Sequence, residues 1–567
     1  MRTILFAAIL FAPSQDGPWP APVAGFQAPA QGEHPRLFFR KADLPRLRER
    51  AATPEGKAIV ARLKELLGGG DAMPTAFNPN TGPQKDGSGA FHSSAPVGKA
   101  YTLWHGAGFG MLWLLSGEKK HADLARQCVE KALAGQRDRD NRYSFKDPVG
   151  ALRAGPSLGA VAMAYDLAYD GWDEEFRKRV AQALAGYNEG KFMSLEELAR
   201  GSRHGPHSNH WGCQIGGAAL ALLAVQGDPG ADDAKVKSLL EANAKCIVRQ
   251  VTEGHGDGGY FNEHAGPGQI ASDTAYLPAV QAWRVAGGKD FVGPRPNVSN
   301  VSLVRVYELL AKKGGGYHYP LRHPSSYGTQ AFERDGLSRG GQFAQGFGAV
   351  KPDYRPALQW TFQNVLEPDA AKRSYDLVGP YPHRAVLALA NWPIGEAERN
   401  PAEVLPRVLH DSLKHYAVFR NRWKDADDVV VTGLWGARND GKEPVMVWGL
   451  GERIDWGVCP KQKESKLSGV RPDGSGVITA GPCSLAVDFS KASGADALLV
   501  LVGPGAGEGP APRSPKAKAS SVSAGGTTFH VLTLSAGAHP EAKAEGEALV
   551  VGGQRVTLSN GTLALGK

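Results

Sequence analysis

The sequence has few cysteines, no long apolar run and no dense patch of one charge, and each shortage excludes a class of protein. No run approaches the roughly 18 apolar residues of a membrane span, so we expect a soluble chain without one. Basic residues give a formal net charge of +8 but are scattered, which argues against a nucleic-acid partner. The cysteines form no CxxC pair, which excludes a zinc finger or a disulfide scaffold and predicts small buried side chains. They are Cys128, Cys213, Cys246, Cys459 and Cys483.

Common catalytic motifs are missing as well. The sequence contains no HExxH, no GxSxG and no phosphate-binding loop, since the glycine run after Lys313 lacks the following Lys-Ser/Thr. His204, His207 and His210 are spaced three apart, but Gly205 and Pro206 prevent them from sharing one helix face. A metal site is therefore possible but not favoured.

The N-terminus resembles an export signal. Arg2 is followed by an almost wholly apolar stretch over residues 3–12, as in secretory signal peptides. Residues 13–33 are rich in Pro, Ala and Gly, which predicts an unstructured lead-in. We assign residues 1–33 to the signal and this flexible lead-in, and expect a secreted or periplasmic protein.

A helical repeat runs from about residue 40 to 310, within a predicted toroid domain of residues 34–405 whose last part mixes helical and strand patterns. An almost wholly apolar segment, a glycine break and an amphipathic segment recur along the chain, with breaks at Gly117, Gly171, Gly227 and Gly287, 54, 56 and 60 residues apart. A fixed period indicates one repeated supersecondary unit. An all-apolar helix must be covered on both sides, so the repeat predicts inner and outer helices curled into an incomplete (α/α) toroid. An open solenoid is the alternative.

From residue 406 to 567 the hydrophobic period changes from 3.6 to 2. Short apolar runs separated by Gly, Asp and Ser turns predict an antiparallel β-sandwich. Helices followed by strands indicate two packed domains. The expected fold class is therefore multidomain α+β, with an N-terminal (α/α) incomplete toroid, the catalytic domain, and a C-terminal antiparallel β-sandwich.

The most unusual local composition is RHGPHSNHWG over residues 203–212, directly before an inner helix. Loops at the mouth of a helical ring carry function more often than core positions do. Asn209 and His210 are the catalytic candidates here, with His207 and Trp211 as substrate-binding candidates. Asn209 could equally serve only as a helix cap.

A second polar loop, EGHGDGGYFNEH over residues 253–264, precedes the next inner helix. By the repeat it lies on the same side of the ring as the first loop, one unit further along. Tyr260 and His264 are catalytic candidates and Glu263 a substrate-binding one. Asp257 could simply cap a turn, and Tyr260 could pack in the core.

Aromatic and basic residues elsewhere could line a sugar groove, because aromatic faces stack on sugar rings and arginine pairs with carboxylate or sulfate. Each of them alone is more often a packed or surface residue. The candidates are Trp104, His105, Arg153 and His383, with Tyr317, Tyr319, Arg322, His323, Tyr381 and Arg384 as weaker ones.

Several of these segments together resemble the heparinase II/III and alginate lyase superfamily. They are HPRLFF at 34–39, DLPRL at 43–47, the Asn209-His210 pair, DGGYFNE at 257–263, YAVFR at 416–420 and DDVVV at 427–431. The resemblance implies an (α/α) toroid with a β-sandwich and β-elimination on uronic-acid polysaccharides. It also implies that Asn209 neutralises the substrate carboxylate and that His210 stabilises it or takes the proton.

The chain departs from the family pattern at two places. No tyrosine follows Glu263 in the usual position, so Tyr260 or His264 would have to replace it. The HxH motif expected early in the sandwich is absent from GARNDG at 436–441. No cofactor is therefore required, and the family's structural zinc would have only Asp455 as an expected ligand.

Three functions remain open at this stage. The leading one is an exported polysaccharide lyase acting on an acidic polysaccharide or oligosaccharide. The alternatives are a catalytically silent glycan-binding protein on the same scaffold and a glycoside hydrolase, which would need two carboxylates across the groove. The oligomeric state is left open.

Overall fold

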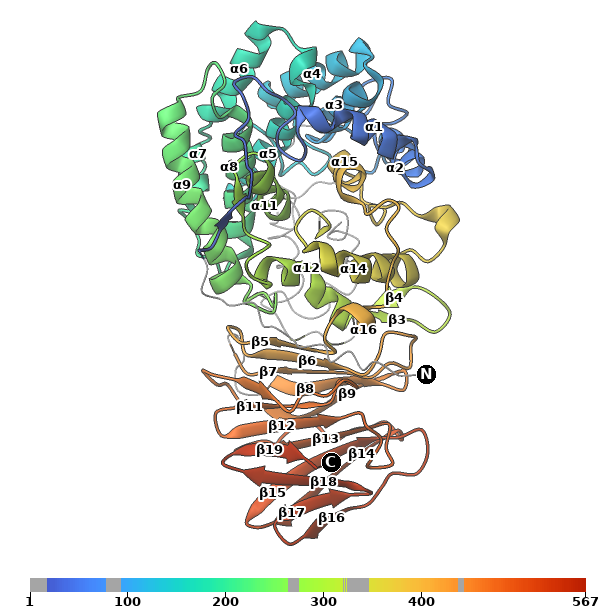
Figure 1. The fold of residues 1–567 in the computed structure, drawn as a ribbon. Helices are drawn as coiled ribbons and strands as arrows, with labels where there is room; N and C mark the ends of the chain where they lie inside the picture. Colours follow the sequence, from blue (N-terminus) through green and yellow to red (C-terminus); the bar gives the residue numbers. More distant parts are fainter. Residues whose placement is uncertain are drawn as a thin grey trace.

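The computed structural model describes residues 18–77, 93–263, 275–319, 321, 323, 346–436 and 443–566. Figure 1 shows a helical domain stacked on a series of antiparallel sheets. The main helices are α1 (Leu44–Ala52), α2 (Pro54–Leu66), α3 (His105–Ser116), α4 (Lys119–Leu133), α5 (Ala151–Ala168), α6 (Glu174–Ala185), α7 (Leu195–Arg200), α8 (Asn209–Val225), α9 (Asp233–Arg249), α11 (Tyr276–Val285), α12 (Asn297–Glu308), α14 (Arg355–Thr361), α15 (Pro382–Asn391) and α16 (Pro401–Val404).

The inner helices form an arc in which α15, α3, α5, α8 and α11 contact one another in that order. Helices α5 and α8 approach closely because glycines meet at their crossing. A Cβ added to Gly155 would lie 2.2 Å from the Cys213 carbonyl oxygen, and one added to Gly217 would lie 1.8 Å from that of Gly155. The glycines of the apolar segments therefore set the spacing of the inner helices.

The outer helices are amphipathic and begin at acidic caps. Asp173 accepts a hydrogen bond from the backbone N–H of Phe176 at the start of α6, and Asp232 does the same for Lys235 at the start of α9. A carboxylate at this position satisfies a free N–H group and complements the helix dipole. The inner–outer alternation follows the sequence repeat.

Three antiparallel sheets follow the helices. The first has strand order β5-β6-β7-β8-β9, the second β10-β11-β12-β13-β15-β14 and the third β16-β17-β18-β19. Their bounds are β5 (Val408–Asp411), β6 (Tyr416–Arg420), β7 (Val430–Leu434), β8 (Glu443–Gly449), β9 (Glu452–Cys459), β10 (Lys466–Ser468), β11 (Gly476–Ala480), β12 (Cys483–Asp488), β13 (Ala497–Val502), β14 (Ala517–Ala524), β15 (Thr527–Leu534), β16 (Ala542–Glu545), β17 (Ala548–Val551), β18 (Gln554–Ser559) and β19 (Thr562–Leu565).

The first two sheets are covered on both faces. The first packs one face against the helical domain, through residues such as Tyr416 and Met446, and the other against the second sheet. The second sheet packs its far face against the third, through residues such as Val500 and Leu549. Double coverage explains why β6, β7, β12 and β13 are buried along their whole lengths. The helical domain followed by antiparallel sheets confirms the predicted fold class.

The expected flexible lead-in is wrong for residues 18–33, which pack on the helical domain. Strand β1 (Ala21–Pro22) pairs with β2 (Lys289–Asp290), and the Trp19 indole N–H donates to the Phe291 carbonyl oxygen at 2.9 Å. Paired backbone and a half-buried indole override the Pro- and Gly-rich composition. Residues 1–17, with the expected signal, lie outside the described residues.

All five cysteines are buried and no two of them form a disulfide, as expected from their spacing. Within the described ranges, we find no helix whose length and apolar character would suit a bilayer crossing.

Candidate functional site

The clearest mark of a site lies on the two central inner helices, α5 and α8. Every residue of α5 is buried except Arg153, and every residue of α8 is buried except His210. Both lie in the first turn of their helices, and Arg153 is close enough to His210 to lower its pKa. The N-termini of α5 and α8 therefore bring a basic side chain, Arg153, close to a titratable one, His210.

The loop before α8 leaves Asn209 available for a ligand. Ser208, rather than Asn209, is the N-cap, and its hydroxyl accepts from the backbone N–H of His210. The Asn209 side chain is 3% exposed, and its Oδ1 has no hydrogen-bond partner in the described part of the chain. The Asn209 backbone N–H donates to Glu263 Oε2 at 2.9 Å. The capping alternative therefore does not apply, and the two polar loops meet at Asn209.

His210 is held in its neutral form. Burial, the largest cause, lowers its pKa to about 4 together with His204 and the arginines at 153 and 203. The rings of His204 and His210 lie 4.3 Å apart. His210 Nδ1 is buried without a hydrogen-bond partner among the described residues. At neutral pH the imidazole is therefore unprotonated and available as a proton acceptor.

The surroundings of His210 are mainly positive. Arg153 and Arg203 both act on it, and the N-termini of α5 and α8 add the positive ends of two helix dipoles. Glu263 supplies a carboxylate, which already accepts the Asn209 backbone N–H. Such an arrangement suits an anionic ligand.

Tyr143 is a candidate that sequence reasoning missed. It is half-buried in the loop before α5, and Arg153 lies close enough to act on its pKa as it does on that of His210. Burial raises the Tyr143 pKa, so the phenol keeps its proton at neutral pH. The repeat gave a usable signal, because this loop precedes an inner helix as the other two do.

An aromatic cluster continues from Tyr143 toward α15. The Trp104 ring lies 5.8 Å from that of Tyr143, 5.0 Å from that of Tyr381 and 4.9 Å from that of His383. Trp104 and His383 are buried, whereas Tyr143 and Tyr381 are half-buried. The structure thus brings Trp104, His383 and Arg153 together with the Asn209 loop. In the aromatic cluster, Tyr143 and Tyr381 are more accessible to solvent than Trp104 and His383.

Three sequence candidates lie away from this place. Tyr260 is buried, and its ring stacks on Tyr416 of β6 at 4.1 Å. The Trp211 ring packs outward, where its indole N–H donates to the Cys246 carbonyl oxygen on α9 at 3.3 Å. His105 is buried next to Thr102, whose hydroxyl lies 2.7 Å from its Nδ1. All three rings are packed in the protein interior. The catalytic and substrate-binding roles expected of these residues stay predictions.

Two further candidates have separate outcomes. His207 is exposed and close enough to Glu253 to lower the pKa of that carboxyl. His264 lies outside the described residues.

No group of three or more His, Cys, Asp and Glu side chains is arranged to hold a metal within the residues that the structure describes. Asp455, the expected metal-binding carboxylate, instead pairs with Arg453, whose Nε lies 2.9 Å from its Oδ1. The GARNDG segment is described only at Gly436.

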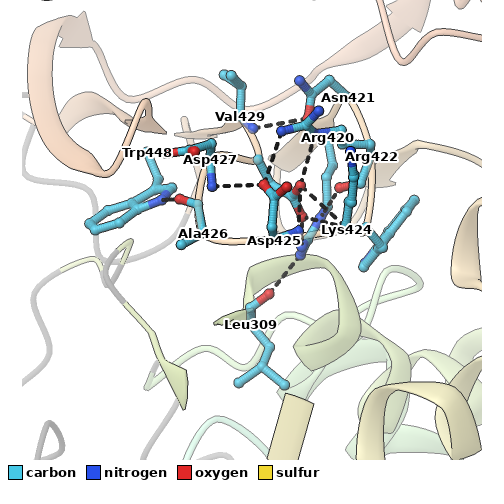
Figure 2. Close-up of polar contacts among 12 residues, drawn as sticks. Leu309, Arg420, Asn421, Arg422, Lys424, Asp425, Ala426, Asp427, Val429 and Trp448 are labelled. Carbon is cyan, nitrogen blue, oxygen red and sulfur yellow. Dashed lines mark hydrogen bonds and ion pairs between the residues drawn. The ribbon is translucent and has the colours of Figure 1, made fainter. Parts of the chain in front are cut away.

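A second charged cluster lies near the start of the β domain, where Arg420 and Arg422 donate to Asp428. Figure 2 labels both arginines and the loop residues beside them. Asp428 accepts from Arg420 at 2.8 Å and from Arg422 at 3.1 Å, and also from backbone N–H groups of the same loop. Arg420 also donates to the carbonyl oxygens of Tyr307 and Leu309 at the end of α12. The cluster joins the two domains and has its hydrogen bonds filled.

A cavity of about 280 Å³ adjoins this cluster. Several of its charged lining groups already have partners, since Arg407 donates to the Asn421 carbonyl oxygen and Asp473 accepts from Ser475. Its other lining residues include Asp427, Lys491 and Asp496. Among the described residues, buried polar atoms without a hydrogen-bond partner occur at the Asn209 site but not in the lining of this cavity.

No protein-family model matches the chain, and no curated protein does so either. Among solved structures it is similar to a heparinase III at 10% identity and a TM-score of 0.39, with 90% of each chain covered. A heparan sulfate lyase mutant from Pedobacter heparinus gives 11% identity and a TM-score of 0.41, with 94% of this chain and 98% of that chain covered. Another heparinase III gives 10% identity and a TM-score of 0.33, with 93% and 98% covered. At such low values, an assignment of function depends on the residues of this chain.

Proposed function

We propose that this chain is a polysaccharide lyase-like protein that cleaves an acidic, uronic-acid polysaccharide by β-elimination. The observation that carries the proposal is the pair Arg153 and His210, the only residues of α5 and α8 that are not buried. They stand beside Asn209, where the sequence resembles the lyase superfamily.

Elimination begins at a C–H bond alpha to the substrate carboxylate, whose proton is only weakly acidic. The enzyme must offset the charge that develops on that carboxylate. Arg153 and the Asn209 side chain would bind it, helped by the dipoles of α5 and α8. Arginine suits this task because its planar fork matches a carboxylate.

The two proton transfers require a base and an acid with separated pKa values. His210, whose pKa is lowered to about 4, would take the proton from C5. Tyr143, whose pKa is raised by burial, would donate its phenolic proton to the departing glycosidic oxygen. The C4–O bond breaks as the C4–C5 double bond forms, so atoms and electrons balance without a cofactor.

The test is ultraviolet absorbance of the unsaturated product during incubation with alginate, pectate, hyaluronan, chondroitin and heparan sulfate. Replacing either proton-transfer group, in His210→Ala or Tyr143→Phe, should lower turnover by about 10²- to 10⁴-fold. The β-domain variant His530→Ala is the matched control and should keep the wild-type rate. Wild-type turnover by His210→Ala would refute the assignment of the base.

A silent glycan-binding protein is the second candidate, favoured by the burial of Tyr260 against Tyr416. It predicts no absorbance change with any polymer, together with saturable binding in calorimetry. Binding should then weaken in Arg153→Leu but not in His530→Ala. Absence of both binding and turnover would reject both candidates.

We also propose export to the periplasm or medium, on the apolar composition of residues 3–12. Fractionation of expressing cells, with N-terminal sequencing of the mature chain, tests it. A chain retained in the cytoplasm with residue 2 intact would contradict it.

A further inference from the structure

Asp411, the last residue of β5, has a buried carboxyl group that contacts residues 254–263 of the second polar loop. Its Oδ2 accepts the backbone N–H of Tyr260 at 3.0 Å. Its Oδ1 accepts the backbone N–H groups of Lys414 at 2.8 Å and Leu413 at 3.2 Å. The Asp411 side chain is 0% exposed, and a buried carboxyl is costly unless such bonds are made. The β domain therefore inserts a carboxyl group into the base of this loop.

The contact is reciprocal. Asp257 of the loop accepts from the Ser412 hydroxyl at 2.5 Å and from the Leu413 backbone N–H at 3.3 Å. The Lys414 ammonium donates to the Glu253 carbonyl oxygen. Each domain thus gives donors and acceptors to the other, which fixes the loop in one register.

The glycines of the loop leave room for Asp411. A Cβ on Gly256 would lie 2.2 Å from Asp411 Oδ1, and one on Gly258 would lie 2.7 Å from Asp411 Cβ. Gly256 also has φ of 133°, a conformation that other residues rarely adopt. Larger residues at Gly256 and Gly258 would therefore collide with the Asp411 side chain.

The same loop reaches the candidate site at its other end. Glu263, three residues after Tyr260, accepts the backbone N–H of Asn209 at 2.9 Å. A shift of the loop would move Glu263 and release the start of α8.

We propose that Asp411 is a positioning residue, through which the β domain holds the 254–263 loop so that Glu263 fixes Asn209 for the substrate carboxylate. The role in turnover rests on the proposed function, whereas the hold on the loop does not.

The groups around Asp411 make this hold dependent on pH. Asp257 faces it from the loop and Lys414 from the β5–β6 turn. Asp257 in turn raises the pKa of His410 and of His415, against the larger effect of burial. Burial and the neighbouring Asp257 raise the pKa of Asp411 well above its usual range. As pH rises, loss of the proton leaves two carboxylates facing each other, and the loop should loosen.

Hydrogen exchange of the full chain tests the hold directly. In Asp411→Ala, the amides of residues 254–263 should exchange at least about tenfold faster than in the wild type. Asp411→Asn keeps the volume but replaces one of the two accepting oxygens by an NH2 group, which cannot accept a backbone N–H. This variant is the alternative if the alanine variant does not fold. The surface variant Asp455→Asn, in the same sheet, should leave exchange unchanged. Unchanged protection of the loop in both Asp411 variants would overturn the proposal.

Turnover and pH separate positioning from general stability. With the polymer that the wild type cleaves fastest, Asp411→Asn should lower kcat/KM by about 10-fold or more, as misplacement of a site group does. Asp257→Asn should abolish the extra rise in loop exchange that accompanies rising pH in the wild type. Faster exchange with unchanged kcat/KM would overturn the positioning role. If the wild type cleaves none of the polymers, the proposed function fails. The hydrogen-exchange experiment still tests whether Asp411 holds the loop.

Discussion

Two charged clusters of this protein differ in how their polar atoms are satisfied. Around Asp428, the arginines at 420 and 422 and the backbone of one loop fill the carboxylate oxygens (Figure 2). Around His210, polar atoms are buried without hydrogen-bond partners in the described part of the chain, namely Asn209 Oδ1, His210 Nδ1, Arg153 Nε and His204 Nε2.

This difference separates a structural role from a ligand-binding one. Leaving a buried polar group unsatisfied costs about 1–3 kcal/mol, so several such atoms in one place indicate a site that a ligand completes. A filled cluster at a domain junction instead holds the junction. Sequence motifs do not make this distinction, since both clusters contribute residues to the lyase resemblance.

The largest effect is expected from breaking the filled cluster. Arg420→Ala leaves Asp428 buried without its closest partner and frees the carbonyl oxygens at the end of α12, so we expect a loss of about 3–5 kcal/mol. Urea unfolding followed by tryptophan fluorescence measures it. The folded fraction should retain turnover, because Arg420 does not belong to the site.

A control addresses the geometry of that arginine. Arg420→Lys keeps the charge but not the fork that serves Asp428 and the α12 carbonyl groups, so it should recover only part of the loss. A loss below about 1 kcal/mol in the alanine variant would contradict the structural role.

The next effect concerns pH at the unfilled cluster. Because the pKa of His210 is lowered to about 4 from the ordinary 6.5, the rate should rise with pH through about 4, and His210 itself should cause no further change above that pH. The unfolded chain takes up this proton first, so stability should fall as pH drops from 6.5 toward 4. His210→Gln should remove that part of the pH dependence of unfolding. An acid limb near 6.5 in kcat/KM would show that another group is the base.

The fold could be predicted because it depends on hydrophobic period. The recurring glycine breaks gave the inner and outer helices, and the change to period 2 gave the sheets. The third sheet was not separated from the sandwich, since stacking of sheets depends on contacts between distant strands such as β13 and β17. The order of residues 18–33 also depends on distant contacts, with Phe291 and Lys289.

The site could be predicted only in part. Asn209 and His210 stood out by composition, and the structure places Arg153 beside them. Tyr143 was missed because its loop, though before an inner helix, contains no unusual cluster of histidines. Tyr260 and Trp211 were expected at the site because the order of residues does not reveal which way an aromatic ring packs.

The smallest effect is expected at the edge of the filled cluster. Lys313 pairs with Asp427 at 3.0 Å, but their side chains are 68% and 46% exposed. Exposed ion pairs contribute about 0–1 kcal/mol and are weakened by salt. Lys313→Ala should therefore change the unfolding free energy by less than about 0.5 kcal/mol, although this pair also bridges the two domains. A loss comparable to that of Arg420→Ala would mean that the number of bridging charges, rather than their burial and filled hydrogen bonds, stabilises the junction.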